Sequence, residues 1–266
     1  MRLKIFIIVI AVLGTAAFFA TKYKWFESGQ GDISRDIEIP VFPTVNYSDD
    51  EPSRSVVDTF PDGIPEYSGY DTVVLDDNRP NFTQYDLEHI AGESFSELDS
   101  LGRCGTAVAM IDYTMMPTEP RGDIGDVKPS GWKQEKYPGI VNSKPPYLYN
   151  RCHLIAYMLT GQNAKVENLI TGTRYFNSEL MLQYENQVAH YLYEAEKPDE
   201  EGRYDRVLYR VTPYFKGKEL VARGVEIEAY SVEDKGDSLS IHVFIYNVQP
   251  GIEIDYKTGE SRVEQQ

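Results

Sequence analysis

Three strand-like runs follow one another near the C-terminal end of the chain, and they restrict the fold more than any other feature. The runs span residues 207–215, 220–232 and 239–248. Apolar and polar side chains alternate in the second run, where Ile227 lies between Glu226 and Glu228, as is typical of a strand with one buried face. Short turns with Gly217 and Gly236 separate the runs, so the sequence predicts a meander of antiparallel hairpins.

The clearest helix of the chain is expected before this meander, at residues 177–196. Leu180, Tyr184, Val188 and Leu192 recur every four residues there, which gives the helix one face that can be buried. Shorter strand-like runs come earlier in the chain, at residues 72–75, 106–113, 147–154 and 168–171. Strands and a helix in this order, without an internal repeat, predict an α+β fold.

Composition and charge limit the kinds of protein that this chain can be. Of the 266 residues, 41% are hydrophobic and 26% are charged, which excludes a wholly disordered chain and a protein with many membrane spans. The net charge of −16 argues against binding of polyanions by bulk charge. The charge is uneven, however, because residues 25–99 carry 18 acids and 3 bases, whereas residues 121–185 carry 8 bases and 6 acids. The net charge of the whole chain therefore does not exclude an anionic ligand for residues 121–185.

An apolar run at the N-terminus indicates export. Residues 5–20 are apolar or small, and Arg2 and Lys4 precede them. Lys22, Lys24 and Trp25 resemble a membrane border, so we expect an uncleaved membrane anchor in residues 1–26. A cleaved signal peptide and a buried N-terminal helix are the alternatives. Either form of export places the protein at the surface of a bacterial cell or in its surroundings.

The next segment, residues 27–63, is rich in Asp, Glu, Ser and Pro and has no sustained period. We expect it to be an acidic linker, followed by one folded domain at residues 64–266. Within that domain, Cys104 and Cys152 are the only cysteines, which excludes a disulfide scaffold and a four-cysteine zinc site. Because thiols can oxidise outside the cytoplasm, a single bridge between the two is the simplest expectation, and two buried thiols are the alternative.

Polar residues that can carry chemistry gather between the strand-like run at 147–154 and the start of the helix. They are Asn150-Arg151-Cys152-His153, then Asn168, Asn177 and Glu185. A histidine at the end of one strand, an amide on the next and an amide at a helix start can converge when a ββα hairpin folds over the helix N-terminus. Taken singly, Asn177 reads as a helix cap and Glu185 as part of a solvated helix face.

Hydrolysis of a phosphodiester needs these residue types. A histidine can take a proton from water near neutral pH, because its ordinary pKa is about 6.5. Mg²⁺ prefers oxygen ligands and needs few of them from the protein, so the carbonyl oxygen of Asn177 can suffice. Arginine can brace a phosphate through two parallel hydrogen bonds.

The spaced pattern resembles that of the DNA/RNA non-specific endonucleases of the ββα-metal (His-Me finger) superfamily, and most of all the streptococcal-type DNA-entry and secreted nucleases. The mark of that family is D-R-G-H followed by N-x8-N-x7-E, whose second part stands intact here as Asn168, Asn177 and Glu185. The resemblance covers residues 64–260 and includes the segments 129–132, 208–213 and 247–251. It implies a ββα-metal finger attached to a central antiparallel sheet.

The resemblance also implies a role for each position. His153 would be the general base that activates water, and Asn177 the direct Mg²⁺ ligand, with Mn²⁺ as a substitute ion. Glu185 would orient the water ligands of the metal, Asn168 would support the finger or orient His153 or the phosphate, and Arg151 would help to build the site. A separate arginine contacts phosphate in this family, and Arg121, in the long loop predicted at residues 116–137, is our candidate for it. Arg103 and Arg174 are further candidates.

These roles predict a metal-dependent endonuclease that cuts DNA, with RNA as a second substrate, without sequence preference and without an organic cofactor. Two positions depart from the family pattern, since Asn150 stands in place of Asp and Cys152 in place of Gly. The loss of that carboxylate leaves an alternative open, a catalytically weakened binding or assembly module on the same scaffold. A phosphodiesterase for another anionic polymer, such as teichoic acid, is a third reading.

Overall fold

The computed structural model describes residues 63–265. The expected N-terminal anchor and acidic linker lie outside these residues. The chain divides into two units, and one of them, residues 53–117 and 123–266, holds every element named below; residues 118–122 fall in the other unit. None of the helices between residues 63 and 265 is long and apolar enough to cross a membrane.

A six-stranded antiparallel sheet forms the centre of the main unit. Its strands are β1 (Thr72–Val74), β2 (Gly92–Phe95), β3 (Ala107–Asp112), β6 (Arg206–Tyr214), β7 (Gly224–Ser231) and β8 (Ser240–Tyr246). They lie in the order β1-β8-β7-β6-β3-β2, and every neighbouring pair is antiparallel. The expected meander is confirmed as β6, β7 and β8, so the prediction of an α+β fold with a central antiparallel sheet is correct.

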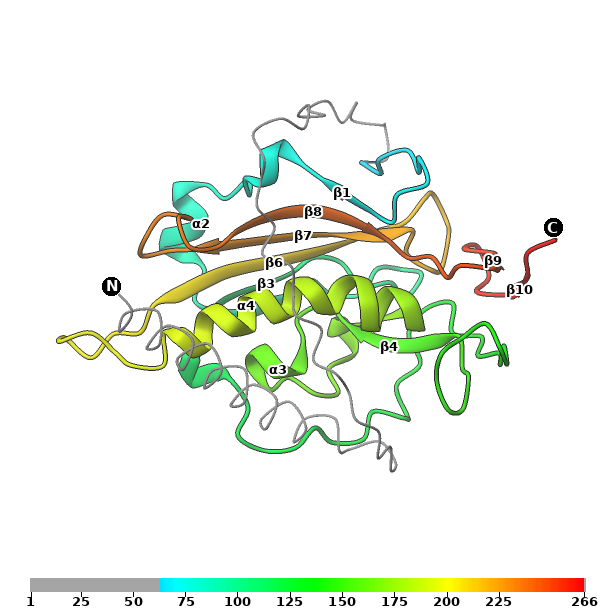
Figure 1. Cartoon of the computed structure of the whole chain (residues 1–266), viewed down its shortest axis with the longest axis horizontal. Helices are drawn as coiled ribbons and strands as arrows, with labels where there is room; N and C mark the ends of the chain where they lie inside the picture. Colours follow the sequence, from blue (N-terminus) through cyan, green and yellow to red (C-terminus); the bar gives the residue numbers. More distant parts are fainter. Residues whose placement is uncertain (1–62, 266) are drawn as a thin grey trace, which may run out of the picture. The chain divides into compact units, whose positions relative to one another are not determined.

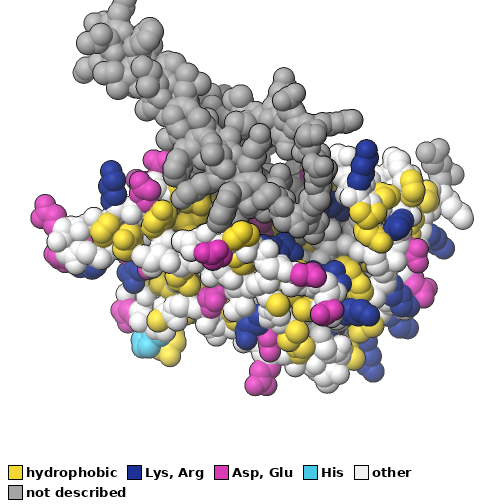
Figure 2. Space-filling model, turned by 90° about the horizontal axis from the view of Figure 1, so that it is seen from below, with side chains coloured by type: hydrophobic (Ala, Val, Ile, Leu, Met, Phe, Trp, Pro, Cys, Tyr) yellow, Lys and Arg dark blue, Asp and Glu magenta, His cyan; other side chains and the backbone are white. Residues whose placement is uncertain are grey.

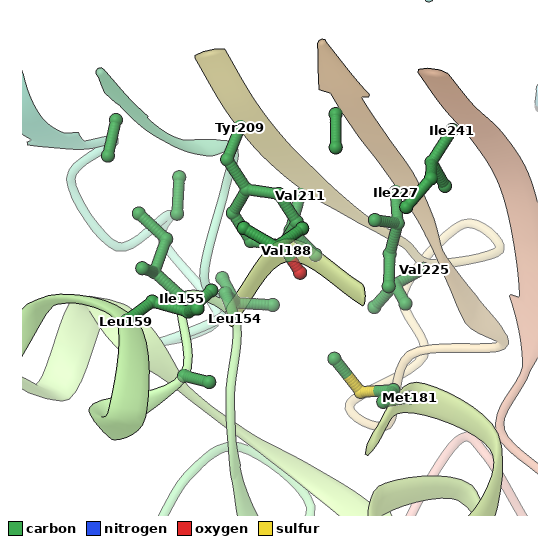
Figure 3. Close-up of a cluster of buried hydrophobic side chains, with 14 of the residues drawn as sticks. Leu154, Ile155, Leu159, Met181, Val188, Tyr209, Val211, Val225, Ile227 and Ile241 are labelled. Atoms are coloured by element: carbon green, nitrogen blue, oxygen red, sulfur yellow. The ribbon is translucent and has the colours of Figure 1, made fainter. Parts of the chain in front are cut away.

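One face of this sheet carries the main hydrophobic core. Tyr209, Ile227 and Ile241 lie on this face, and Val188 of α4 (Leu182–Glu194) belongs to the same buried cluster (Figure 3). All four side chains are at most 2% exposed. The predicted helical period is therefore confirmed, because its apolar face covers the sheet (Figure 1).

The opposite face carries charge under the segment that follows β1. Arg210 forms an ion pair with Glu228 at 2.6 Å, and Nε2 of His242 lies 2.7 Å from Oε1 of Glu226. Burial lowers the pKa of His242, but the hydrogen bond to Glu226 and the negative charges nearby outweigh it and raise the pKa above its usual value. The backbone of Asn81 donates to Glu228, so the cluster fixes the segment to the sheet. Since these side chains already satisfy one another, we interpret the cluster as structural.

A second, two-stranded sheet forms the finger that resemblance predicted. It pairs β4 (Tyr149–His153) with β5 (Leu169–Thr173) in antiparallel register, with His153 opposite Leu169. The short helix α3 (Tyr157–Thr160) and the turn η3 (Val166–Asn168) connect the two strands. β5 leads into the π-helical turn η4 (Phe176–Met181), which continues into α4. The ββα order is therefore present.

Several elements went unforeseen from the sequence. They are α2 (Gln84–His89), the short turn η2 (Tyr113–Met115), the edge strand β2, and the C-terminal hairpin of β9 (Ile252–Ile254) and β10 (Ser261–Val263). The residues Asp76-Asp77-Asn78, whose composition predicts a turn, do form one, η1 (Asp76–Asn78). Helix α2 begins with a capping box in which Thr83 and Asp86 each bond the other's backbone. That pair was readable in the sequence, whereas three-residue strands carry too little periodicity to be recognised.

The expected disulfide is wrong, because Cys104 and Cys152 are both buried thiols that no bridge joins. The sulfur of Cys104 lies 3.2 Å from the carbonyl oxygen of Leu169. The sulfur of Cys152 is packed close to Gly172 instead. The two thiols therefore pack against different residues. Burial raises the pKa of the Cys104 thiol to about 12.

Candidate active site

His153 ends β4 with a fixed ring orientation. Its Nε2 atom lies 2.7 Å from the carbonyl oxygen of Asn163, and the residue is 6% exposed. A carbonyl oxygen can only accept a hydrogen bond, so Nε2 carries the proton and Nδ1 is the basic nitrogen of the neutral ring. Sequence reasoning missed Asn163, because a backbone carbonyl leaves no mark in the residue type.

Asn168 supports the segment that follows His153. Its side chain is fully buried; Oδ1 accepts the N–H of Ile155 at 2.8 Å, and Nδ2 donates to the Ile155 carbonyl at 2.9 Å. The Asn168 carbonyl also accepts the N–H of Leu154 at 2.9 Å. These bonds extend the β4–β5 pairing beyond His153, and a side chain buried in this way has no surface to offer a phosphate.

Arg151 is turned toward the preceding loop. Its Nε and one terminal nitrogen donate to the carbonyls of Val127 and Gly125, and its guanidinium lies 4.3 Å from the ring centroid of Trp132. The guanidinium thus holds the loop against the finger. This arrangement agrees with a part in building the site and not with a direct contact to substrate.

Asn177 and Glu185 lie on η4 and α4, eight positions apart. Asn177 is half-buried inside the π-helical turn and not at the N-cap, which is Tyr175; π-turns within helices are frequent at functional sites. Its side chain makes no hydrogen bond to any residue from 63 to 265. Glu185 is buried, likewise without a hydrogen bond or ion pair in the described part of the chain. Burial raises the pKa of Glu185 to about 8.

This donor set fits a hard divalent cation. A buried carboxyl without a counter-charge costs free energy unless a cation or a network of water compensates it. The amide oxygen of Asn177 and the carboxylate of Glu185 are the oxygen donors that Mg²⁺ prefers. The residues present therefore suit a metal centre that completes its coordination with water.

The three candidate phosphate arginines have different surroundings. Arg103 is held by Asp99 at 2.7 Å and by the carbonyls of Gly217 and Glu219. Arg174 is half-buried directly after β5 and has no carboxylate partner among residues 63–265. Arg121 is exposed in segment 118–122, outside the unit that carries the finger, so its role stays a prediction.

Comparison with known proteins identifies the family. The model of the DNA/RNA non-specific endonuclease domain matches residues 82–233, which is more than half of the chain. The chain belongs to the DNA/RNA non-specific endonuclease family. The finger, helix and central sheet described above lie largely within this match.

Two solved nucleases are similar to this endonuclease in structure. NucA from Streptococcus agalactiae with a bound magnesium ion has a TM-score of 0.59 and 29% identity, over 71% of this chain and 84% of NucA. Sda1 nuclease with a bound zinc ion has a TM-score of 0.53 and 26% identity, over 66% of this chain and 83% of Sda1. The resemblance drawn from the spaced asparagines and glutamate is thus confirmed at the level of family and fold.

Proposed function

We propose that the protein cleaves DNA, and RNA as a second substrate, in an Mg²⁺-dependent reaction in which His153 is the general base. The observation that carries this proposal is the pair Asn177 and Glu185, on η4 and α4 directly after the finger. Both are oxygen donors without a hydrogen-bond partner among residues 63–265. The magnesium ion in the NucA structure supports the choice of ion. The apolar residues 5–20 support action outside the cytoplasm, at the cell surface or after secretion.

The chain's own residues divide the reaction among them. Nδ1 of His153 takes the proton of the attacking water, and the Nε2–H donated to Asn163 holds the ring in place while it becomes charged. Asn177 would hold the metal directly, and Glu185 would orient its water ligands. Bound there, Mg²⁺ supplies positive charge for the phosphate and the leaving oxygen. Asn168 holds the backbone that follows His153, and Arg151 holds the loop at residues 125–127 against the finger.

The first test is cleavage of plasmid DNA by the full chain with Mg²⁺, with Mn²⁺, with Zn²⁺ or with EDTA. We expect nicking with Mg²⁺ and Mn²⁺ and none with EDTA. His153→Ala removes the base and should lower the rate by about 10²- to 10⁴-fold. His89→Ala is the matched control, because His89 is exposed and stacks on Tyr85.

Folded protein that cleaves nothing in any of these ions would reject the proposal in favour of the weakened scaffold. Cleavage that survives His153→Ala would show that another group is the base. Asn177→Ala should raise the Mg²⁺ concentration needed for half-maximal rate. An unchanged Mg²⁺ dependence would remove Asn177 from the metal site.

A further inference from the structure

One buried amide joins the finger to the central sheet. Asn247 directly follows β8 and is fully buried. Its Oδ1 accepts the N–H of Thr173 at 3.0 Å, and its Nδ2 donates to the carbonyls of Thr171 and Ala222, each at 3.0 Å. Thr171 and Thr173 belong to β5, whereas Ala222 lies just before β7. A single side chain at the end of β8 therefore links β5 of the finger to the segment that enters β7.

The side-chain amide of Asn247 makes the two hydrogen bonds that a neighbouring strand would make with the free edge of β5. The Thr171 carbonyl and the Thr173 N–H are two residues apart on one edge of that strand, where an adjacent strand would bond them. An asparagine offers two donors and an acceptor, so it can satisfy both groups and Ala222 as well. With the amide reversed, its oxygen would face two carbonyl oxygens, which fixes the orientation.

Val248 and Gln249, the two residues after Asn247, also bond the corner between β5 and η4, residues 173–176. The hydroxyl of Thr173 donates to the carbonyl of Val248 and accepts the N–H of Phe176 at 3.0 Å. Oε1 of Gln249 accepts the N–H of Tyr175 at 3.2 Å. Residues 247–249 thus bond the corner at Thr173 and Tyr175, and Thr173 in turn bonds Phe176, the residue before Asn177.

We propose that Asn247 is a positioning residue for Asn177, and that it acts by fixing the β5–η4 corner against the central sheet. The inference rests on the proposed function, since it assumes that Asn177 binds the metal. A two-stranded sheet is marginal by itself, so the finger needs an outside restraint. Mg²⁺ tolerates little departure from octahedral geometry, so a small shift of its ligand lowers its affinity.

Two variants of the full chain break this restraint at different points. Asn247→Ala removes the amide, and Thr173→Val keeps the shape of the side chain but removes the hydroxyl that links Val248 to Phe176. Mn²⁺ binding, followed by electron paramagnetic resonance, reads the metal site without any turnover. We expect Asn247→Ala to weaken Mn²⁺ binding about 10- to 100-fold, as loss of an outer partner of a metal ligand does, and Thr173→Val to weaken it less. The kcat should fall at a fixed Mg²⁺ concentration and recover in part with excess Mg²⁺, while the KM for DNA stays close to wild type.

Two controls separate positioning from a general loss of stability. Ser231→Ala removes a buried hydroxyl bonded to Leu239 in the sheet, away from the finger. Tyr256→Phe removes a hydrogen bond to the backbone carbonyl of Asn247 and leaves its side-chain bonds intact. Both variants should bind Mn²⁺ like wild type, even if the midpoint temperature of their thermal unfolding is lower.

The outcomes distinguish this inference from the proposed function. If Asn247→Ala and Thr173→Val fold and bind Mn²⁺ as tightly as Ser231→Ala, Asn247 has no positioning role, while wild-type cleavage still supports the nuclease. Should Asn247→Ala fail to fold, Thr173→Val alone decides by the same comparison. A wild-type chain that neither cleaves DNA nor binds Mn²⁺ overturns both.

Discussion

At the scale of single residues, Glu185 is the most unusual group in the described part of the chain. It lies in the first turn of α4 with no Lys or Arg paired to it among residues 63–265, and burial raises its pKa to about 8. The hydroxyl of Tyr209 on β6 is also buried without a hydrogen-bond partner among residues 63–265. Burial, and after it the charge of Glu185, raises the pKa of Tyr209 far above its usual range. A protein that keeps such groups bears a cost in stability that a functional site can explain.

That cost predicts how the stability of the metal-free protein depends on pH. Folded Glu185 keeps its proton up to about pH 8, whereas the unfolded chain loses it near the ordinary value of 4.5. Between these values the folded state binds more protons, so the free energy of unfolding falls as the pH rises, by at most about 1.4 kcal/mol per pH unit. Urea unfolding in EDTA should show Glu185→Gln close to wild type at pH 5 and more stable at pH 8.5.

The matched control for this prediction is Glu179→Gln, because Glu179 is an exposed acid in the preceding turn of the same helical segment. It should follow the wild-type curve at every pH. If Glu185→Gln also follows that curve, the carboxyl is ionised in the folded protein and some charge compensates it. Activity should still fall in Glu185→Gln, because a neutral amide is a poorer acceptor for the metal's water ligands.

At the scale of elements, the finger depends on a close approach between β5 and its neighbours. Gly172 lies opposite Asn150 in the β4–β5 register. A Cβ atom at position 172 would lie 2.3 Å from the sulfur of Cys152 and 2.7 Å from the ring of Phe176. Only glycine at position 172 leaves room for these two buried side chains, so the packing of Cys152 requires the glycine.

Gly172→Ala should therefore destabilise the protein by about 1–3 kcal/mol, the usual effect of overpacking a core. Cys152→Ala removes the closer of the two clashing atoms. The double variant should then be more stable than the sum of the single changes predicts, and thermal unfolding of all four proteins measures that coupling. Strict additivity would mean that the strand shifts bodily and that the sulfur is not the obstacle.

The elements were predicted well where the sequence carries a period, and poorly where contacts between distant residues decide. The meander and α4 followed from alternation and from the recurrence of Leu180, Tyr184 and Val188. The pairing of Asn168 with Ile155, and of Asn247 with β5, joins residues 13 and 74 to 76 positions apart, and nothing local marks these bonds. The resemblance gave the site residues but could not show that Arg151 turns toward carbonyls and a tryptophan ring.

At the scale of the whole molecule, an acidic protein has to bind an acidic polymer. Most described arginines are neutralised by acids, as in the pairs Arg210–Glu228 and Arg223–Glu219. Lys128, Lys136 and Lys144, in the stretch that leads into β4, are exposed and have no carboxylate partner among residues 63–265. Figure 2 views the molecule from below relative to Figure 1. It shows Lys and Arg side chains gathered at the right-hand end, which is the end where Figure 1 places β4. Contact with nucleic acid should therefore be local and involve few phosphates.

This arrangement predicts a shallow dependence of DNA affinity on salt. Each neutralised phosphate contributes about 0.9 to the slope of log affinity against log salt, so two to four contacts give a slope of about −2 to −4. Fluorescence anisotropy with EDTA present measures binding without cleavage. Replacing Lys128 and Lys144 together by Gln should flatten the slope by about 1 to 2.

The control carries the same change of net charge at another place. Lys218 and Lys235 are also exposed, in the turns of the meander, and their replacement by Gln should leave the slope unchanged. If both double variants flatten the slope equally, bulk charge governs binding and the surface before β4 has no special part. If the wild-type slope is near zero, the complex depends on contacts other than phosphate, and a nuclease that tracks the backbone without reading sequence would not bind in that way.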